Sequence, residues 1–373
     1  MTTARPPVGS LLFVGFDGVS PTPRLKSLIQ KERIGGVILF RRNIESPKQV
    51  ARLTETLHTW AGSDGLLIGI DQEGGRVQRL PAPFTQWPPA QRVGACRGHE
   101  PAYRMGQAIA LELRAVGINL DFAPVLDVGT AVKNPIIGDR AFSNDPDAVA
   151  ALGLAFISGL QDHGVIACGK HFPGHGDTSV DSHKALPVVT AKADALLERE
   201  LKPFRHAIAN RLATLMTAHV RYPSLDPEWP ATLSPAILTT LLRQTLGFDG
   251  VVFTDDLEMK GITDHWTPEA AAVRAIQAGA DSVLVCKDEA VQDRVLAGLH
   301  RAVEKKTLQA DRVTLSLVRL ARLKEQFLRS HPSRRPSKKS GEGKGSPVSI
   351  IGCEEHQELA RMLAGKSRAT TTR

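Results

Sequence analysis

Eight short and almost entirely apolar segments between residues 11 and 286 constrain the fold of this chain more than any other feature. They are "LLFVGF" from Leu11, "GGVILF" from Gly35, "GLLIGI" from Gly65, "INLDFAPVLDV" from Ile118, "VIACGK" from Val165, "TLMTAHV" from Thr214, "VVFTDD" from Val251 and "SVLVC" from Ser282. These segments are rich in β-branched residues and lack polar–apolar alternation, which is typical of parallel strands covered on both faces.

The segments between these predicted strands show helical periodicity. Several begin with an oxygen-bearing cap before a proline, as in Ser46-Pro47, Asp145-Pro146, Ser234-Pro235 and Thr267-Pro268. Gly117 and Gly164 stand where helices should end before a strand. Eight strand–helix alternations predict an α/β fold, a single-domain TIM-type (β/α)8 barrel over residues 1–330, with an open doubly wound sheet as the structural alternative.

The last 43 residues, 331–373, differ in composition from the predicted barrel. They begin with "HPSRRPSKKSGEGKGSP", which predicts a disordered basic tail. Leu359 and Leu363 could belong to a short amphipathic helix, which would be too short to fold alone. Whether such a helix is transient or docks on a partner is left open by the sequence.

The charge and the cysteine content of the chain exclude several classes of protein. The formal net charge is +8, but 331–373 carries nine Lys or Arg and four Glu, which leaves only +3 for residues 1–330. A nucleic-acid partner is therefore not expected. The four cysteines are widely separated, and neither an export-signal pattern nor a membrane-length apolar run is present. We expect a cytoplasmic protein with reduced thiols and no membrane contact.

Charged residues follow five of the predicted strands. They are Asp71, Asp127, Lys170 with His171, His219, and Asp255 with Asp256. Because barrel active sites lie at the carboxyl ends of the strands, these residues are expected to gather at one barrel mouth. This convergence makes an enzyme more probable than a set of ordinary loop residues.

The stretch "KHFPGHGDTSVDSH", residues 170–183, admits two chemistries. Its three histidines, His171, His175 and His183, could join His219 and Asp255 in a metal-dependent hydrolase. Barrel hydrolases of that kind usually carry an HxH pair at the first strand end, which here reads "VGFDGV". The metal interpretation is therefore disfavoured, and no metal ligand is predicted.

The second chemistry is retaining glycoside hydrolysis, which needs a nucleophilic carboxylate and a proton donor across the scissile bond. Asp255 suits the first role, because the end of a buried strand holds a side chain rigidly. His183 suits the second role on a loop that can close. Asp181, two residues earlier, could orient the imidazole and favour its protonated form.

Five motifs, "KHFPGHGDTSVDSH", "DQEGGRVQRL", "NLDFAPVLDV", "IIGDRAFSNDP" and "VVFTDDLEM", resemble glycoside hydrolase family 3 in the same order. The likeness runs from about Leu11 to Phe327 and is greatest to the bacterial single-domain β-N-acetylhexosaminidases of peptidoglycan recycling. The resemblance implies Asp255 as nucleophile, Asp256 as its structural companion and the Asp181–His183 pair as general acid/base. The sugar-binding residues it implies are Asp71, Arg79, Arg140, Lys170 and His171.

The resemblance also implies the reaction. The expected enzyme removes terminal β-linked N-acetylglucosamine from anhydro-muropeptides, acts as a monomer on a small sugar substrate, and needs no cofactor. Many relatives carry a second domain after the barrel, whereas only residues 331–373 follow here, so the barrel must supply its own acid. His175 and His219 receive no catalytic role. A phosphorylase, a metal-dependent hydrolase and a catalytically silent sugar-binding barrel are the alternatives.

Overall fold

The computed structural model describes residues 7–130, 134–178, 181–182, 184–329 and 347–365, and its centre is a closed barrel of eight parallel strands. The strands follow one another around the barrel in the order β1-β10-β9-β8-β7-β6-β3-β2. Their bounds are β1 Leu12–Val14, β2 Gly36–Leu39, β3 Leu67–Ile70, β6 Leu120–Asp121, β7 Ile166–Phe172, β8 Thr214–Thr217, β9 Val251–Asp256 and β10 Ser282–Val285. Every apolar segment singled out in the sequence contains one barrel strand, so the predicted (β/α)8 barrel is confirmed.

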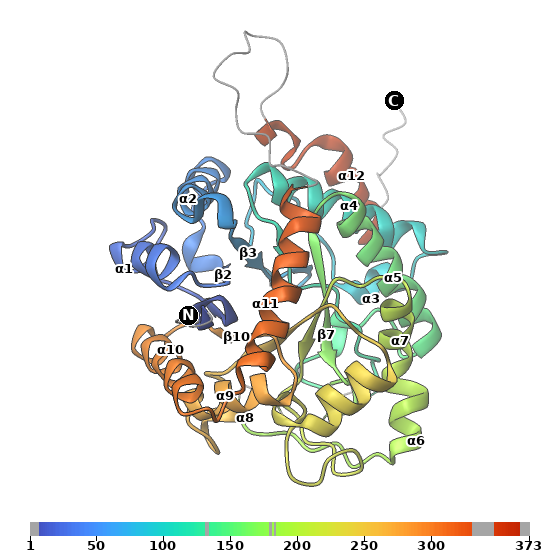
Figure 1. Ribbon diagram of the computed structural model, residues 1–373. Coiled ribbons are helices and arrows are strands. Elements are labelled where there is room, and N and C mark those ends of the chain that lie inside the picture. Colours follow the sequence, from blue (N-terminus) through green and yellow to red (C-terminus); the bar gives the residue numbers. More distant parts are fainter. Residues whose placement is uncertain (1–6, 131–133, 179–180, 183, 330–346, 366–373) are drawn as a thin grey trace, which may run out of the picture.

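Helices surround the barrel (Figure 1). The α-helices are α1 Pro23–Ser27, α2 Pro47–Ala61, α3 Ala90–Gly94, α4 Glu100–Ala115, α5 Pro146–Asp162, α6 Ala193–Ala195, α7 Leu201–Ala209, α8 Lys260–Thr263, α9 Pro268–Ala278, α10 Glu289–Glu304, α11 Ala310–Lys324 and α12 Glu354–Leu363. The side chains of Ser46, Asp145 and Thr267 cap α2, α5 and α9 as predicted. Within the described ranges, none of these helices combines the length and apolarity that crossing a membrane requires.

Helices of the 3-10 and π types lie in several of the segments that connect these elements. The 3-10 helices are η1 Val8–Leu11, η3 Arg41–Asn43, η4 Gly62–Asp64, η5 Gly138–Arg140, η7 Ala231–Leu233 and η10 Pro347–Ile350. The π-helices are η2 Leu28–Glu32, η6 Leu196–Glu200, η8 Ala236–Thr245 and η9 Glu325–Arg329. A two-stranded antiparallel hairpin, β4 Gln72–Gly74 and β5 Val77–Gln78, follows β3 and carries part of the "DQEGGR" motif.

Three phenylalanines fill the barrel interior. Phe253 contacts Phe13 and Phe122 edge to face, with ring centroids 5.0 and 5.5 Å apart. A Cβ at Gly36 would lie 2.3 Å from the Phe13 ring, and one at Gly69 would lie 2.6 Å from the Phe122 ring. Large and small residues thus alternate between neighbouring strands, which packs the interior and leaves chemistry to the barrel mouth.

Helix α11 closes the N-terminal end of the barrel and lies in front of the strands in Figure 1. Asp281, which precedes β10, is fully buried. It accepts hydrogen bonds from Ser316 Oγ at 2.8 Å and Arg312 Nη2 at 3.1 Å, both on α11, and from Arg243. Burial would raise the pKa of this carboxyl, but the guanidinium groups hold it below its ordinary value. This end of the barrel is therefore tied together by one buried anion.

The C-terminal segment differs from its prediction as a disordered tail. Residues 331–346 and 366–373 lie outside the described residues, but η10 and α12 fold against α4 (Figure 1). His356 Nδ1 lies 2.8 Å from Glu112 Oε1, and Gly352 N donates to the same oxygen at 3.0 Å. Leu359 and Leu363 are buried. Because the helix buries an apolar face and a His–Glu pair, it does not have to be stable alone.

Candidate active site

A cluster of opposite charges lies at the barrel mouth, at the ends of β3 and β7. Lys170 Nζ is 2.8 Å from Asp71 Oδ1 and 2.6 Å from Glu73 Oε1. Arg140 forks onto Glu73 with two contacts of 2.8 Å, and Arg79 Nη2 donates to Asp71 Oδ2 at 3.2 Å. Burial would raise the pKa of both carboxyls, but the cations outweigh it, so the pKa of Glu73 falls to about 2 and that of Asp71 falls well below its usual range. Both acids are anionic acceptors at neutral pH.

His171 and Asp127 form a second buried pair beside this cluster. His171 Nδ1 lies 2.7 Å from Asp127 Oδ2, and the backbone N–H groups of His171 and His175 donate to Asp127 Oδ1. These contacts orient the His171 ring, which packs edge to face on His175 with centroids 5.7 Å apart. Since Nδ1 of His171 contacts Asp127, Nε2 is the ring nitrogen that can contact a ligand.

His175 ties the segment after β7 together. Its Nδ1 lies 2.8 Å from Thr178 Oγ1 and its Nε2 lies 3.1 Å from Ser182 Oγ. Burial, with a contribution from His171, lowers the pKa of His175 to about 4. A neutral, fully hydrogen-bonded imidazole of this kind holds a loop in place, in agreement with its interpretation as a non-catalytic residue.

The predicted nucleophile and its neighbour occupy the end of β9. Asp255 and Asp256 are half-buried, and Asp256 N donates to Asp255 Oδ1 at 2.8 Å. Asp256 Oδ1 accepts from the backbone N–H groups of Glu258 and Cys286, so this side chain braces the turn after the strand. Burial, together with the charge of Glu258, raises the pKa of Asp256 to about 7. Asp255 thus lies at the barrel mouth, and the turn that follows its strand is held in place by the side chain of Asp256.

His219 contacts the backbone at the end of β9. Its Nε2 is 3.0 Å from the carbonyl oxygen of Asp256 and its Nδ1 is 2.7 Å from Thr232 Oγ1. Because a carbonyl oxygen only accepts, Nε2 carries a proton that it donates to Asp256 O. His219 therefore supports the strand that bears Asp255.

The predicted acid–base pair is only partly described. His183 lies outside the described residues. Asp181 is half-buried, and its backbone oxygen accepts hydrogen bonds from Lys184 N at 2.8 Å and Ala185 N at 3.0 Å. The next residue, Ser182, accepts at its carbonyl oxygen from Gly261 N at 3.0 Å. Since α8 begins five residues after Asp255, this contact fixes the Asp181 segment near the end of β9.

In the described residues, no group of three or more His, Cys, Asp or Glu side chains is arranged to hold a metal ion. Of the imidazoles that the sequence offered as ligands, His171, His175 and His219 lie in the described residues, and each contacts a protein oxygen, of Asp127, of Thr178 and Ser182, and of Thr232 respectively.

Comparison with known proteins shows the family to which the chain belongs. The model of the glycosyl hydrolase family 3 N-terminal domain matches residues 5–323. The chain belongs to glycoside hydrolase family 3. It is similar to the beta-hexosaminidase of Nitrosomonas eutropha, with 38% identity over 86% of this chain and 94% of that protein. The beta-hexosaminidase of Thiobacillus denitrificans is 45% identical over 71% of this chain and 75% of its own length.

Two solved structures of family 3 members extend the comparison. A β-N-acetylglucosaminidase from Paenibacillus sp. str. FPU-7 is 41% identical, with a TM-score of 0.91 over 98% of this chain and 69% of that one. NagZ from Neisseria gonorrhoeae, solved in complex with N-trifluoroacetyl-D-glucosamine, is 33% identical, with a TM-score of 0.77 over 96% and 98% of the two chains. The family establishes that this protein is a glycoside hydrolase enzyme.

The structure adds residues to the family 3 site that the sequence analysis missed. Glu73 pairs with both Lys170 and Arg140, so Arg140 is bound to a protein carboxylate, and its contact with a sugar stays a prediction. Asp121, at the end of β6, has an oxygen, Oδ2, without a hydrogen-bond partner in the structure. Burial raises its pKa well above the ordinary value. In the sequence, the only signal was a charged residue inside the apolar segment from Ile118.

Proposed function

We propose that this chain is a retaining β-N-acetylglucosaminidase that releases terminal β-linked N-acetylglucosamine from muropeptides, with the cytoplasm as the predicted setting. The observation that carries the proposal is a half-buried carboxylate, Asp255, at the end of β9, on the same mouth as the Asp71–Lys170 pair. The names of the similar beta-hexosaminidases and β-N-acetylglucosaminidase, and the N-trifluoroacetyl-D-glucosamine bound by NagZ, support this substrate class.

In the proposed first step, an Asp255 carboxylate oxygen attacks the anomeric carbon and the bond from that carbon to the leaving oxygen breaks. His183 gives its proton to the leaving oxygen. Water then attacks the same carbon, loses a proton to neutral His183, and Asp255 departs. Two inversions give net retention. Asp181 would orient the His183 imidazole throughout.

The charged cluster suits the binding of a sugar at the mouth. Asp71 is an anionic acceptor for hydroxyl protons, and Lys170 and Arg79 are donors on the same face. His171, oriented by Asp127, offers Nε2 to another oxygen of the ligand. A polar ligand needs several such groups fixed in advance, because each mispaired polar group costs affinity.

Trapping the glycosyl-enzyme tests the nucleophile and the reaction type together. A 5-fluoro N-acetylglucosaminyl fluoride, which slows breakdown of the intermediate, should add one sugar to the intact protein, and peptide mass spectrometry should find it on Asp255. A different labelled residue would refute the assignment. Turnover without any adduct would favour attack by the substrate's own acetamido group.

The acceptor in the second step is tested separately. An imidazole acid/base does not repel an anion as a carboxylate would, so phosphate could replace water in the same chemistry. Muropeptides digested with and without phosphate, analysed by mass spectrometry, should yield free N-acetylglucosamine in both cases. N-acetylglucosamine 1-phosphate as the main product would identify a phosphorylase instead.

A further inference from the structure

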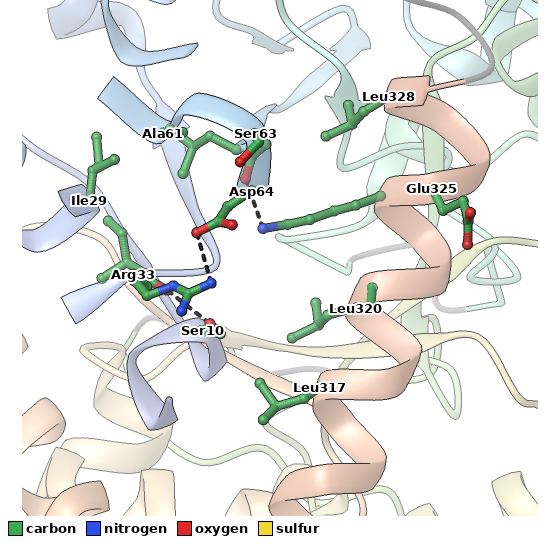
Figure 2. A pocket seen from close by; sticks show the side chains of 15 residues that line it. Ser10, Ile29, Arg33, Ala61, Ser63, Asp64, Leu317, Leu320, Glu325 and Leu328 are labelled. Atoms are coloured by element: carbon green, nitrogen blue, oxygen red, sulfur yellow. Dashed lines mark hydrogen bonds and ion pairs between the residues drawn. The ribbon is translucent and has the colours of Figure 1, made fainter. Parts of the chain in front are cut away.

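A cavity of about 350 Å³ lies at the N-terminal end of the barrel, remote from the candidate active site. It is bordered by Ser10 in η1, by Leu66 immediately before β3, by Arg33 after η2, and by α11 and η9 (Figure 2). The cluster of opposite charges around Lys170 lies at the other end of the barrel, at the carboxyl ends of the strands. The volume is within the range of cavities that bind small molecules.

About half of the cavity wall is apolar, and larger apolar side chains make up most of that half. They are Ile29, Ile34, Leu66, Leu317, Leu320 and Leu328. Figure 2 shows Leu317, Leu320 and Leu328 projecting from α11 and η9 toward the side that carries Ile29 and Ala61, whereas Glu325 points away. The wall therefore fits an apolar chain better than a sugar.

The polar end of the cavity has more positive than negative charge facing it. Arg33 Nη2 pairs with Asp64 Oδ2 at 2.8 Å, and both side chains are more than half exposed. Lys324 Nζ donates to the Gly65 carbonyl oxygen at 2.9 Å and, in the part of the chain that the structure describes, makes no ion pair. An ammonium has three N–H donors, so two remain for a ligand. Burial lowers the pKa of Lys324 to about 8, despite the opposing charge of Asp64.

We propose that this cavity binds a small carboxylate with an unbranched apolar chain, with the carboxylate on Lys324 and the chain along the leucines of α11. A carboxylate would balance the excess cation and accept the remaining N–H groups, since a half-buried charge is costly without a partner. The six apolar side chains favour a ligand with an apolar chain over a purely polar anion such as phosphate, and the two cations disfavour an amine.

Three probes of matched length separate these contributions. Calorimetric titration at pH 7 with hexanoate, 1-hexanol and hexylamine should give saturable binding of hexanoate, at least tenfold weaker binding of hexanol and none of hexylamine. Because Lys324 must be protonated, hexanoate affinity should fall about tenfold from pH 7 to pH 9. Equal binding of hexanoate and hexanol, or no binding of hexanoate, would overturn the proposal.

Two variants locate the site. Lys324→Met removes the charge while keeping a chain of similar length, and it should weaken hexanoate binding at least tenfold, whereas Lys305→Met, on an exposed lysine, should not. Leu317→Trp should block the cavity by size with Lys324 intact. Unchanged glycosidase activity shows that each variant is folded. Hexanoate binding that survives both cavity variants would place the ligand elsewhere and refute the proposal.

Discussion

At the N-terminal end of the barrel a single carboxylate, Asp281, is sealed among guanidinium groups, whereas at the mouth the carboxylates of Asp71 and Glu73 share the ammonium of Lys170. The Asp281 side chain has no exposure to solvent, but that of Asp71 is 14% exposed and that of Arg79 30%. Both clusters keep their acids ionised. Only the second leaves charged groups that a ligand could contact, and this exposure separates a candidate binding site from a brace.

The largest expected difference between the two ends concerns activity. Asp255→Ala should lower kcat/KM for a nitrophenyl N-acetylglucosaminide by about 10⁴-fold or more, because no other group would form the covalent intermediate. The melting temperature should change little, since Asp255 is half-buried at the end of its strand and lies outside the apolar core. Asp264→Ala, on an exposed acid that follows α8, is the matched control and should keep full activity. Full turnover by Asp255→Ala would remove the proposed nucleophile.

The opposite end should respond in stability. Asp281→Asn leaves Arg243 and Arg312 buried without their anion, which is expected to cost about 3–5 kcal/mol of unfolding free energy. Urea unfolding followed by circular dichroism measures the loss. At a temperature where the variant is folded, its kcat should match that of the parent enzyme. A fall in kcat with unchanged unfolding would show that the two ends are not separable as argued.

The sequence predicted which charged residues lie at the carboxyl ends of strands better than it predicted which of these residues pair with one another. Asp71 follows β3, and Lys170 and Asp255 lie near the ends of β7 and β9, so their position at the carboxyl end of a parallel strand places them at the mouth. The pairing of Glu73 with Arg140 joins residues 67 positions apart through a hairpin and a 3-10 helix, and no local pattern encodes it.

The C-terminal segment shows the same limit. The short helix α12 is predicted to be unstable when considered alone, and its packing depends on Glu112, a buried acid in α4 that no feature of the segment itself reveals. Local periodicity thus predicts elements, while charge pairs over long sequence separations depend on the completed fold.

A smaller effect is expected for the support of the Asp181 segment. His175→Ala removes the contact to Ser182 Oγ, so Asp181 should be held less firmly. Loss of acid catalysis matters most when the leaving group is poor. The variant should therefore lose about 10-fold with an alkyl N-acetylglucosaminide and less with a dinitrophenyl one. His175→Asn should recover part of the loss, because an amide can still bond to the serine. Equal losses on both substrates would indicate a general structural defect.

A pH-dependent effect on stability concerns two mouth carboxyls whose pKa values move in opposite directions. The pKa of Glu73 falls to about 2, so its contribution to stability is present above its unfolded pKa and is lost as the pH falls toward 2. The pKa of Asp256 rises to about 7, so its contribution is complete below its unfolded pKa of about 4 and is lost as the pH rises through 7. Deprotonating Asp256 therefore destabilises the fold, whereas deprotonating Glu73 stabilises it.

Asp256→Asn isolates the second contribution. The amide oxygen can still accept from the N–H groups of Glu258 and Cys286, but the side chain no longer ionises. The unfolding free energy of the variant should exceed that of the parent at pH 8 by on the order of 2 kcal/mol, because Asp256 keeps some contact with water and the full shift is not felt. At pH 4 the two proteins should be alike. Parallel stability curves from pH 4 to 8 would mean that burial does not hold this carboxyl protonated.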